Sequence, residues 1–407
     1  MDINELIYSF KRDDYQRDNF DSFLKKVSFK YEVPSIHIAG TNGKTVVASM
    51  LSNIYTYSGR KTGLFVSSST RSEISDMIRI NGQSVSNSEI EKIFNDNQKL
   101  FKKYDLSHFE ICVFIALSIF KNEEVDIAII ECGMGGEYDA TNVFVPVLSI
   151  ITNVSIEHTE CLGVSTSEIA LHKAGIIKNN IPTLIGEIEG DALDVIVDVS
   201  KRKNSNITRI GDSHNLTPSE NGVTFDYKTY RDIYVPNLSM INVKNTCLVI
   251  DAVDLLIESF PVSESALKEG LSKSLPNGRF EIIKGELNYI VDAAHNADAI
   301  AKLRRDIDNI ASGKHIYVIF ACFRNKNITV MLPEIALLGK LYLTTFNHDR
   351  ARDESDYFLY LDEYQFVEDY KEIISKIKEE DSEAIVVITG STVFAEMVSE
   401  QIKNEKL

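Results

Sequence analysis

The sequence predicts an α/β protein of two domains, each built around a mostly parallel sheet. Short apolar runs alternate with amphipathic stretches, which is the pattern of strands buried on both faces and connected by helices. With 407 residues, the chain is longer than one typical hydrophobic core supports. The stretch SKSLPNG, residues 272–278, places Pro276 and Gly278 between two such alternations. We therefore expect a first domain over residues 1–275 and a smaller second domain over residues 276–407.

In the first domain, five apolar runs are predicted as strands. They cover residues 35–39, 63–67, 127–132, 147–152 and 183–185. Amphipathic stretches between them predict helices over residues 46–58, 87–104 and 110–121. Residues 200–240 differ, because polar turns separate shorter alternating stretches there, and they predict a β-rich appendage to the sheet.

The second domain repeats the alternation of strands and helices. Its predicted strands cover residues 289–292, 316–320, 340–345, 365–367 and 384–389. Its predicted helices cover residues 298–310, 368–378 and 392–403. This pattern indicates a second α/β unit.

Composition and charge exclude several classes of function. The formal net charge of −17 argues against a nucleic-acid partner, although local basic pockets could still bind small anions. No apolar run is long enough for a membrane helix, and the N-terminus lacks the apolar core of a signal peptide. The five scattered cysteines form no C-x-x-C pair, which fits a reducing compartment. We expect a cytoplasmic monomer that binds small molecules and neither membranes nor nucleic acid.

The first motif with chemical content is HIAGTNGKTV, residues 37–46. Its glycines let backbone N–H groups converge on an anion, and a helix predicted to begin near Lys44 adds its N-terminal dipole. The Lys44 ammonium supplies charge, and the Thr45 hydroxyl can bind Mg²⁺. The full P-loop pattern has another glycine five residues before Gly43, where this chain has Ile38. The motif alone therefore leaves a tight strand-to-helix turn open as an alternative.

Two further motifs place polar residues after strands of the same sheet. In IIECGMGGEYDATNV a buried strand ends in Glu131, where a nucleotide-bound Mg²⁺ needs an oxygen ligand. The alternative is a strand-end acid beside a glycine turn. In SIITNVSIEHTECLG the loop carries Glu157 and His158. A lone histidine is usually structural or exposed, but at this edge of the sheet it is a candidate ligand for a second metal.

The remaining motifs lie on a helix of the first domain and in the second domain. In EIALHKAGIIK, Lys173 lies on a helix where a solvated charge is the ordinary interpretation. LPNGRFEI carries Arg279, which can bind phosphate with two hydrogen bonds. YIVDAAHNADAI carries Asp292, His295 and Asn296 after a strand. Nucleotide contacts and simple helix capping by Asp292 or Asn296 both remain open.

Taken together and in order, these motifs resemble the folylpolyglutamate synthase and dihydrofolate synthase family of the Mur ligase superfamily. The resemblance runs from about residue 35 to residue 395 and rests on GTNGKT, SDMIRINGQSVS, ECGMGGEYDATNV, IITNVSIEHTECLG, HKAGIIK, NGRFE, DAAHN, IFACFRNKNIT and VVITGS. It implies a P-loop ATPase domain followed by a Rossmann-like domain, with the active site between them. It also implies an enzyme that phosphorylates a carboxylate with ATP, after which the amine of L-glutamate attacks the acyl phosphate.

The resemblance implies a role for each candidate residue. The residues that would bind ATP are Gly40, Thr41, Asn42, Gly43, Lys44, Thr45, Arg279, Asp292, His295 and Asn296. The catalytic residues would be Lys44, His158 and Lys173. Two Mg²⁺ ions would be bound by Thr45, Glu131 and His158, assisted by a carbamate on Lys173. The residues expected to contact the substrate are Ser68, Arg71 and Asp139.

Some positions depart from the family pattern and leave the substrate open. Residues 67–71 read SSSTR where the family has Ser-Pro-His-Leu, and FRNKN replaces a typical Asp-Lys-Asp. We expect dihydropteroate, folate or both as substrate, with Arg71 favouring glutamylated forms. One alternative is a Mur-type ligase for another carboxylate. Another is a non-catalytic nucleotide-binding protein, but such a protein would not need Glu131, His158 and Lys173 together.

Overall fold

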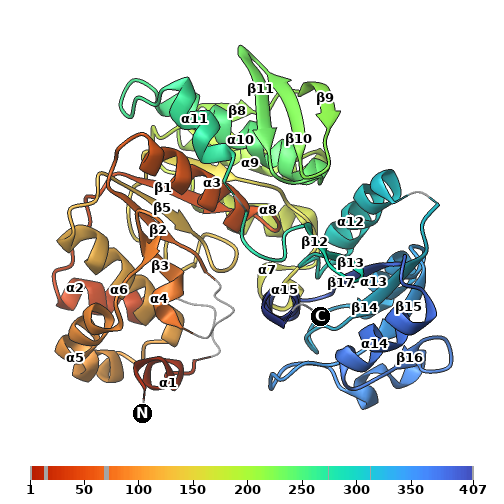
Figure 1. The fold of residues 1–407 in the computed structure, drawn as a ribbon. Helices are drawn as coiled ribbons and strands as arrows, with labels where there is room; N and C mark the ends of the chain where they lie inside the picture. Colours follow the sequence, from red (N-terminus) through yellow and green to blue (C-terminus); the bar gives the residue numbers. More distant parts are fainter. Residues whose placement is uncertain (1, 13–16, 68–72, 274, 312, 406–407) are drawn as a thin grey trace. The chain divides into compact units, whose positions relative to one another are not determined.

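The computed structural model describes residues 2–12, 17–67, 73–273, 275–311 and 313–405. The chain divides into two compact units, and each is described by itself (Figure 1). The first unit comprises Met1–Thr217, Thr224–Val235 and Asn242–Ser274, and the second comprises Pro218–Val223, Pro236–Ile241 and Leu275–Leu407. Two short segments ahead of residue 275 therefore belong to the second unit.

The first unit is built on an eight-stranded sheet with strand order β4-β3-β2-β5-β1-β6-β7-β8. The strands are β1 Ser35–Ala39, β2 Thr62–Phe65, β3 Ile78–Ile80, β4 Gln83–Ser84, β5 Ile127–Glu131, β6 Leu148–Ile151, β7 Thr183–Ile185 and β8 Ile207–Arg209. Only β3 and β4 run antiparallel to their neighbours. The prediction of a mostly parallel sheet is confirmed, and β1 and β5 are buried at every residue because helices cover both faces.

Helices of the first unit connect these strands. They are α1 Ile3–Tyr8, α2 Asp18–Lys26, α3 Lys44–Tyr57, α4 Ile74–Met77, α5 Asn87–Lys103, α6 His108–Asn122, α7 Thr159–Leu162, α8 Thr166–Ala174, α9 Gly190–Arg202, α10 Met240–Leu256 and α11 Glu264–Leu271. Helices α5, α6 and α8 each begin with a serine whose side chain pairs with a glutamate three residues on. These capping boxes satisfy N–H groups that the first turn leaves without partners, which fixes where the helices start.

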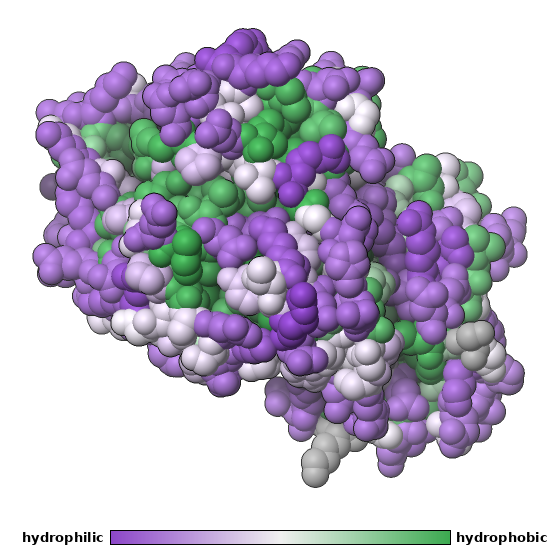
Figure 2. All heavy atoms as spheres, turned by 90° about the horizontal axis from the view of Figure 1, so that it is seen from above, coloured by the Kyte–Doolittle hydropathy of each residue, from purple (hydrophilic) through white to green (hydrophobic). Residues whose placement is uncertain are grey.

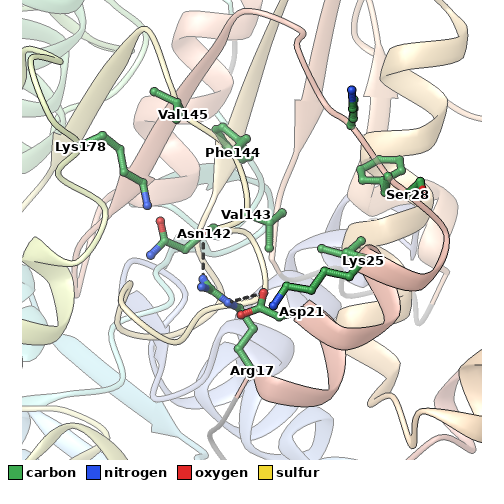
Figure 3. Close-up of a pocket in the computed structure, with 12 residues that line it drawn as sticks. Arg17, Asp21, Lys25, Ser28, Asn142, Val143, Phe144, Val145 and Lys178 are labelled. Atoms are coloured by element: carbon green, nitrogen blue, oxygen red, sulfur yellow. Dashed lines mark hydrogen bonds and ion pairs between the residues drawn. The ribbon is translucent and has the colours of Figure 1, made fainter.

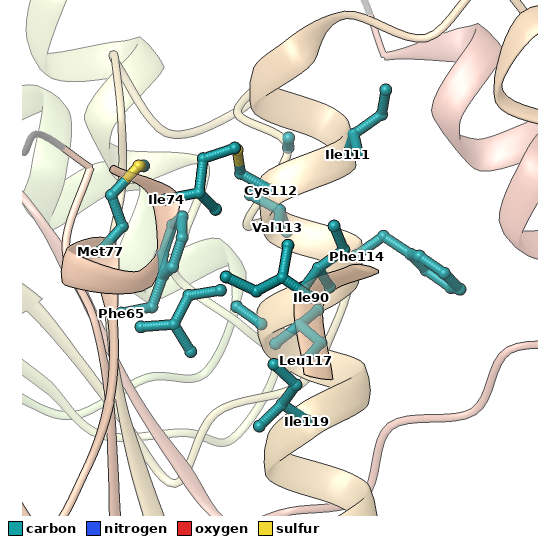
Figure 4. Packing of buried hydrophobic residues seen from close by; sticks show 14 of the residues in the cluster. Phe65, Ile74, Met77, Ile90, Ile111, Cys112, Val113, Phe114, Leu117 and Ile119 are labelled. Atoms are coloured by element: carbon teal, nitrogen blue, oxygen red, sulfur yellow. The ribbon is translucent and has the colours of Figure 1, made fainter. Parts of the chain in front are cut away.

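The core of the first unit is best seen around α6, which is buried along most of its length. Figure 4 shows Phe65 of β2 with Ile74 and Met77 of α4 opposite Cys112 and Val113 of α6. Because α6 has apolar side chains almost all round, it packs between the sheet side and its neighbouring helices. This packing holds the strands, and therefore the loops that follow them, in fixed positions.

The β-rich appendage expected over residues 200–240 is present, with one difference. A three-stranded sheet in the order β11-β10-β9 contains β9 His214–Pro218, β10 Val223–Tyr227 and β11 Tyr230–Val235. Strand β8, however, pairs in parallel with β7 and so belongs to the large sheet. Its sequence is Ile-Thr-Arg, and one apolar residue is too weak a pattern to predict a sheet strand.

The second unit is built on a six-stranded sheet with order β12-β13-β17-β14-β15-β16. The strands are β12 Glu281–Lys284, β13 Asn288–Val291, β14 Ile316–Phe320, β15 Lys340–Leu343, β16 Gln365–Phe366 and β17 Ile385–Thr389. The helices are α12 Ala297–Ile310, α13 Ile328–Ala336, η1 Glu354–Tyr360, α14 Tyr370–Glu380 and α15 Thr392–Glu405. All neighbours are parallel except the edge pair β12 and β13, and β12 was not predicted.

Hydrogen bonds attach the segment of residues 236–241 to the rest of the second unit. The Asn237 amide donates to the Arg279 carbonyl at 2.7 Å and to the Phe280 carbonyl at 3.1 Å. The Ser239 hydroxyl donates to the Asp306 carboxylate at 2.5 Å. These bonded side chains are buried, so the segment is an integral part of the second unit.

Within the described residues, no helix is both long and apolar enough to cross a membrane. The space-filling view agrees with an ordinary polar exterior: Figure 2 shows mostly hydrophilic side chains on this face, with apolar patches between them.

Candidate functional site

The segment GTNGKT forms the turn between β1 and α3, at the carboxyl edge of the large sheet. Gly40 has a φ of +152°, and a Cβ added there would lie 1.8 Å from the Thr152 hydroxyl oxygen. Gly43 has a φ of +84° and immediately precedes α3. Side chains are strained or excluded at both positions, so the turn requires glycine. The predicted helix start near Lys44 is confirmed.

Residues of the loop after β6 brace this turn. The Asn153 side-chain oxygen accepts the N–H groups of Thr41 at 3.2 Å and of Asn42 at 2.8 Å. The Thr152 hydroxyl donates to the Asn42 carbonyl at 2.6 Å. Sequence reasoning singled out neither Thr152 nor Asn153. The available signal was an amide side chain directly after a strand that neighbours β1 in a parallel sheet.

The structure brings Lys44, Thr45 and Glu131 together. Strands β1 and β5 are parallel neighbours, with Ile38 paired to Glu131, so the end of β5 lies beside the turn. The Lys44 ammonium donates to the carbonyls of Gly40 at 2.9 Å and Thr41 at 3.0 Å. The Thr45 hydroxyl donates to a Glu131 carboxylate oxygen at 2.9 Å. Cation, hydroxyl and carboxylate thus share one site.

Glu131 is 2% exposed, and Ser67 also donates to it through its N–H at 3.3 Å and its hydroxyl at 3.2 Å. Burial raises the pKa of Glu131, while Lys44 and the donors from Thr45 and Ser67 oppose that rise. A buried carboxylate held by two hydroxyls has the oxygen donors that Mg²⁺ prefers, and a cation would offset its burial. Thr45 and Glu131 therefore fit a magnesium ion.

His158 is less clearly placed for a metal. It precedes α7 with a φ of +52°, and its Nδ1 lies 3.6 Å from a Glu160 carboxylate oxygen. In the part of the chain that the structure describes, no three His, Cys, Asp or Glu side chains gather as a metal site. The role of His158 as a second-metal ligand stays a prediction.

Lys173 is 3% exposed, so the interpretation as a solvated charge is wrong. Burial, reinforced by the Lys44 ammonium, lowers the pKa of Lys173 to about 7, against the opposing effects of Glu157, Cys132 and Asp139. The glycine loop packs closely against this helix: a Cβ at Gly136 would lie 3.0 Å from the Lys173 carbonyl oxygen. Near neutral pH, a large share of this amine is uncharged and therefore nucleophilic.

Among the predicted substrate residues, Ser68 and Arg71 lie outside the described residues. Asp139 is 3% exposed, and its carboxylate accepts the N–H groups of Met134 at 2.8 Å and Thr141 at 2.9 Å. The Thr141 hydroxyl in turn pairs with the His37 ring at 2.8 Å. Asp139 therefore stabilises its own loop through these hydrogen bonds. Its contact with a substrate stays a prediction.

In the second unit, two of the predicted nucleotide residues make local contacts. The Arg279 guanidinium lies 3.2 Å from a Glu396 carboxylate oxygen. Asp292 accepts the N–H groups of Phe280 and Ala294, both at 2.8 Å. Burial raises the pKa of Asp292 to about 6, against the effect of Arg279.

The other two predicted nucleotide residues also bond nearby backbone. Asn296 accepts the N–H of Ala299 at 2.9 Å and caps α12. His295 pairs through Nδ1 with the Ala293 carbonyl at 2.7 Å. Capping is therefore observed for Asn296 but not for Asp292, which bridges two turns instead.

Comparison with known proteins identifies a known family domain in each of the two units. Residues 38–253 match the Mur ligase middle domain, and residues 278–392 match the glutamate ligase domain of Mur ligases. The dihydrofolate synthase/folylpolyglutamate synthase of Bacillus subtilis (strain 168) is 28% identical over 394 residues, which are 91% of each chain.

Solved structures agree in fold. The folylpolyglutamate synthase of Thermotoga maritima superposes with a TM-score of 0.82 at 27% identity, over 98% of this chain and 96% of that one. The Mycobacterium tuberculosis folylpolyglutamate synthase complexed with ADP and AMPPCP gives a TM-score of 0.86 at 24% identity, over 94% of each chain. The expected α/β architecture is confirmed.

The fold and the domain matches define the class of protein: this chain belongs to the Mur ligase family of ATP-dependent acid–amino-acid ligases. Within that family, it is a member of the folylpolyglutamate synthase and dihydrofolate synthase branch, as the motifs indicated: the dihydrofolate synthase/folylpolyglutamate synthase of Buchnera aphidicola subsp. Schizaphis graminum (strain Sg) is 31% identical over 296 residues, which are 72% of this chain and 68% of that one.

Proposed function

We propose that this protein uses ATP to join L-glutamate to a folate-type carboxylic acid, as a folylpolyglutamate synthase, a dihydrofolate synthase or both. The observation that carries the proposal is the contact between Thr45 and Glu131 beside Lys44, at the end of two parallel strands. Buried Lys173 is electrostatically coupled to Lys44. The curated relative from Bacillus subtilis carries both activities in its name.

The proposed reaction has two steps. A carboxylate oxygen of the acid attacks the γ-phosphorus of ATP and ADP leaves, which converts a poor electrophile into an acyl phosphate. The glutamate amine then attacks the acyl carbon, phosphate leaves, and the nitrogen loses a proton. Both steps concentrate negative charge on phosphoryl oxygens, so fixed cations aimed at those oxygens lower the barrier.

The chain supplies those cations and the surrounding geometry. The Lys44 ammonium, which here bonds the Gly40 and Thr41 carbonyls, would donate to the β- and γ-phosphates instead. The N–H groups at the start of α3 add the positive end of a helix dipole. Thr152 and Asn153 keep the turn in shape, so the loop need not reorganise to bind phosphate.

Thr45 and Glu131 would hold the first Mg²⁺, and that ion would neutralise phosphate charge. For the second ion we propose His158 with a carbamate on Lys173. The uncharged Lys173 amine attacks the carbon of CO₂ and loses a proton, which replaces a cation by a carboxylate-like group. The lowered pKa of Lys173 supports this step because only the neutral amine reacts.

We also propose that Arg279, Asp292, His295 and Asn296 of the second unit contact ATP, and that Asp139 contacts the acid. Support comes from the motif resemblance and from the matched glutamate ligase domain. The substrates would be the only partners of a cytoplasmic monomer, which agrees with a net charge of −17 that disfavours nucleic acid. Sedimentation or size-exclusion measurement tests the monomer.

The function is tested by measuring ADP and phosphate release with ATP, Mg²⁺ and L-glutamate. The candidate acids are dihydropteroate, tetrahydrofolate and a muramyl precursor. We expect release that requires both glutamate and a pterin acid. Turnover with dihydropteroate alone, tetrahydrofolate alone, or both separates the three forms of the proposal. Turnover only with the muramyl acid would replace it by a Mur-type ligase for a non-folate carboxylate.

A further inference from the structure

A separate hollow lies on the first unit, between α2 and the chain segment that leads into β6. Its volume is about 720 Å³, within the range of small-molecule sites. Figure 3 shows Arg17, Asp21 and Lys25 of the α2 region on one side, with residues 142–145 and Lys178 on the other. None of the residues that line it belongs to the proposed catalytic set.

Most of the charged side chains described in the lining of this hollow are positive, in a chain whose net charge is −17. Among the described residues, its ionisable lining consists of Arg17, Lys25, Lys30 and Lys178 together with the carboxylate of Asp21. Asp21 is already used, because its carboxylate lies 3.1 Å from the Arg17 Nε. Across the described ranges, the structure records no ion pair or hydrogen bond for the three lysine side chains.

Arg17 is held in a fixed position within the hollow. Its guanidinium donates to the Asn142 carbonyl at 2.8 Å, and its side chain is 22% exposed (Figure 3). Lys178 is half-buried nearby, and burial together with the Arg17 charge lowers the pKa of Lys178 to about 8. Within the described residues, Asp21 pairs with Arg17 but not with Lys178, so a bound anion would relieve the repulsion between the two cations.

We propose that this hollow is an accessory binding site for a small polyanion, a molecule that carries at least two carboxylate or phosphate groups. One anionic group is matched by Arg17 with Lys178, and a second by Lys25 with Lys30. Apolar side chains complete the walls, among them Leu24, Phe29 and Phe144, so the ligand can also carry an apolar body. A glutamylated metabolite and a phosphorylated metabolite are the two sources of this chemistry.

The hollow is joined to the glycine loop by hydrogen bonds. The Asn142 amide donates to the carbonyls of Glu137 and Gly175, both at 3.1 Å. Gly175 directly follows α8, the helix that carries Lys173. A ligand that draws Arg17 away from the Asn142 carbonyl would therefore act on backbone that is hydrogen-bonded to the end of the helix carrying Lys173.

The test is isothermal titration of the full chain at low salt with two probes, tricarballylate and inorganic pyrophosphate. Acetate and chloride at matched ionic strength are the reference anions. The titration uses the Lys44→Ala background, which weakens pyrophosphate binding to the phosphate loop and makes the result independent of turnover. We expect saturable binding of at least one probe. The probe that binds more tightly assigns the ligand to carboxylates or to phosphates.

Two variants and a matched control locate the binding. Lys178→Gln and Lys30→Gln should each weaken the tighter probe about tenfold, the effect of one lost charged hydrogen bond. Lys30 is exposed, so its replacement leaves the fold intact even if Lys178→Gln lowers stability. Lys92→Gln on the exposed face of α5 removes the same charge elsewhere and should change nothing. Binding no tighter than that of acetate, or equal losses in Lys92→Gln and both pocket variants, overturns the proposal.

Discussion

The carboxyl edges of the two sheets use similar polar residues in opposite ways. In the first unit, Lys44, Thr45 and Glu131 come from two different strand ends and converge on one buried site. In the second unit, Asp292 and Asn296 accept backbone N–H groups of residues close to them in sequence or along a neighbouring turn. Strand-end polar residues thus form a shared site in one unit and local backbone supports in the other.

This difference shows how to tell a strand-end carboxylate that only stabilises its loop from one that belongs to a functional site. When a carboxylate accepts N–H groups of its own loop, the stability of that loop is enough to explain why the sequence has an acidic residue there. Glu131 has no such local explanation, since its recorded donors, Thr45 and Ser67, are distant in sequence. Its burial costs free energy that a bound cation offsets. Functional effects should therefore be largest in the first unit.

The largest expected effect is that of Lys44→Ala. Loss of one preorganised charge aimed at the reacting phosphate should reduce turnover by about two to three orders of magnitude. Steady-state ADP release checks this, with Lys92→Ala as a control that removes an exposed lysine of the same unit. Turnover within about twofold of the parent would mean that the phosphate loop does not take part in the reaction. The two units would then no longer differ in function at their carboxyl edges.

Lys173→Ala comes next. Loss of a group that completes a metal site typically lowers activity or metal affinity about 10- to 100-fold, and we expect turnover to fall to a similar extent. Small carboxylates such as formate should restore part of the turnover, because they can replace the carbamate oxygens. An absence of rescue, together with an unmodified Lys173 in a metal-loaded crystal structure, would contradict the carbamate.

Arg279→Ala probes the second unit. If its guanidinium contacts ATP, the KM for ATP should rise about tenfold, the effect of one lost charged hydrogen bond, while the KM for glutamate changes little. Initial-rate measurements with each substrate varied in turn give both constants. Equal shifts in the two constants would mean that Arg279 supports the local structure through its ion pair with Glu396 and does not contact ATP.

The smallest effect concerns Asp292 and pH. Burial raises the pKa of Asp292 to about 6 from its ordinary value of 3.8, so the folded state holds this proton more tightly than the unfolded state. Its stabilising contribution is full below about pH 4 and is lost as the pH rises through about 6. The melting temperature of the parent relative to Asp292→Asn should therefore fall across that window. A flat difference would show that Asp292 is not strained by burial.

Much of the fold was predictable because buried parallel strands have continuous apolar runs with clear limits. The predicted strands over residues 35–39, 183–185 and 316–320 have the same bounds as β1, β7 and β14. Residues 200–240 are predicted only as a β-rich appendage, and β8 within them pairs with β7 in the large sheet; its three residues carry almost no pattern from which this could be predicted. Strand β12 is not predicted, because it is a four-residue stretch, Glu-Ile-Ile-Lys, with only two apolar residues, and it follows closely on the breakers Pro276 and Gly278.

The site residues were predictable where a charged or polar side chain lies at the end of a strand or in the loop that follows it. Lys44 and Glu131 occupy such positions, so the sequence alone indicated that they meet. The support from Asn153 depends on a tertiary contact, because it comes from the loop after another strand. The burial of Lys173 likewise depends on the packing of α8 in the fold. No local sequence pattern predicts those contacts, because they join segments that are far apart in the chain.

The short stretch of residues 236–241 has a consequence for anyone who wishes to handle the two units separately. A fragment that begins at residue 275 would lose the Asn237 amide that bonds the Arg279 and Phe280 carbonyls, and the Ser239 hydroxyl that bonds Asp306. Buried acceptors would then lack their donors at a cost of about 1–3 kcal/mol each. Exchange of the C-terminal half between related enzymes must therefore carry residues 236–241 along with the residues from 275 onward, because an exchange that starts at residue 275 separates these hydrogen-bonding partners.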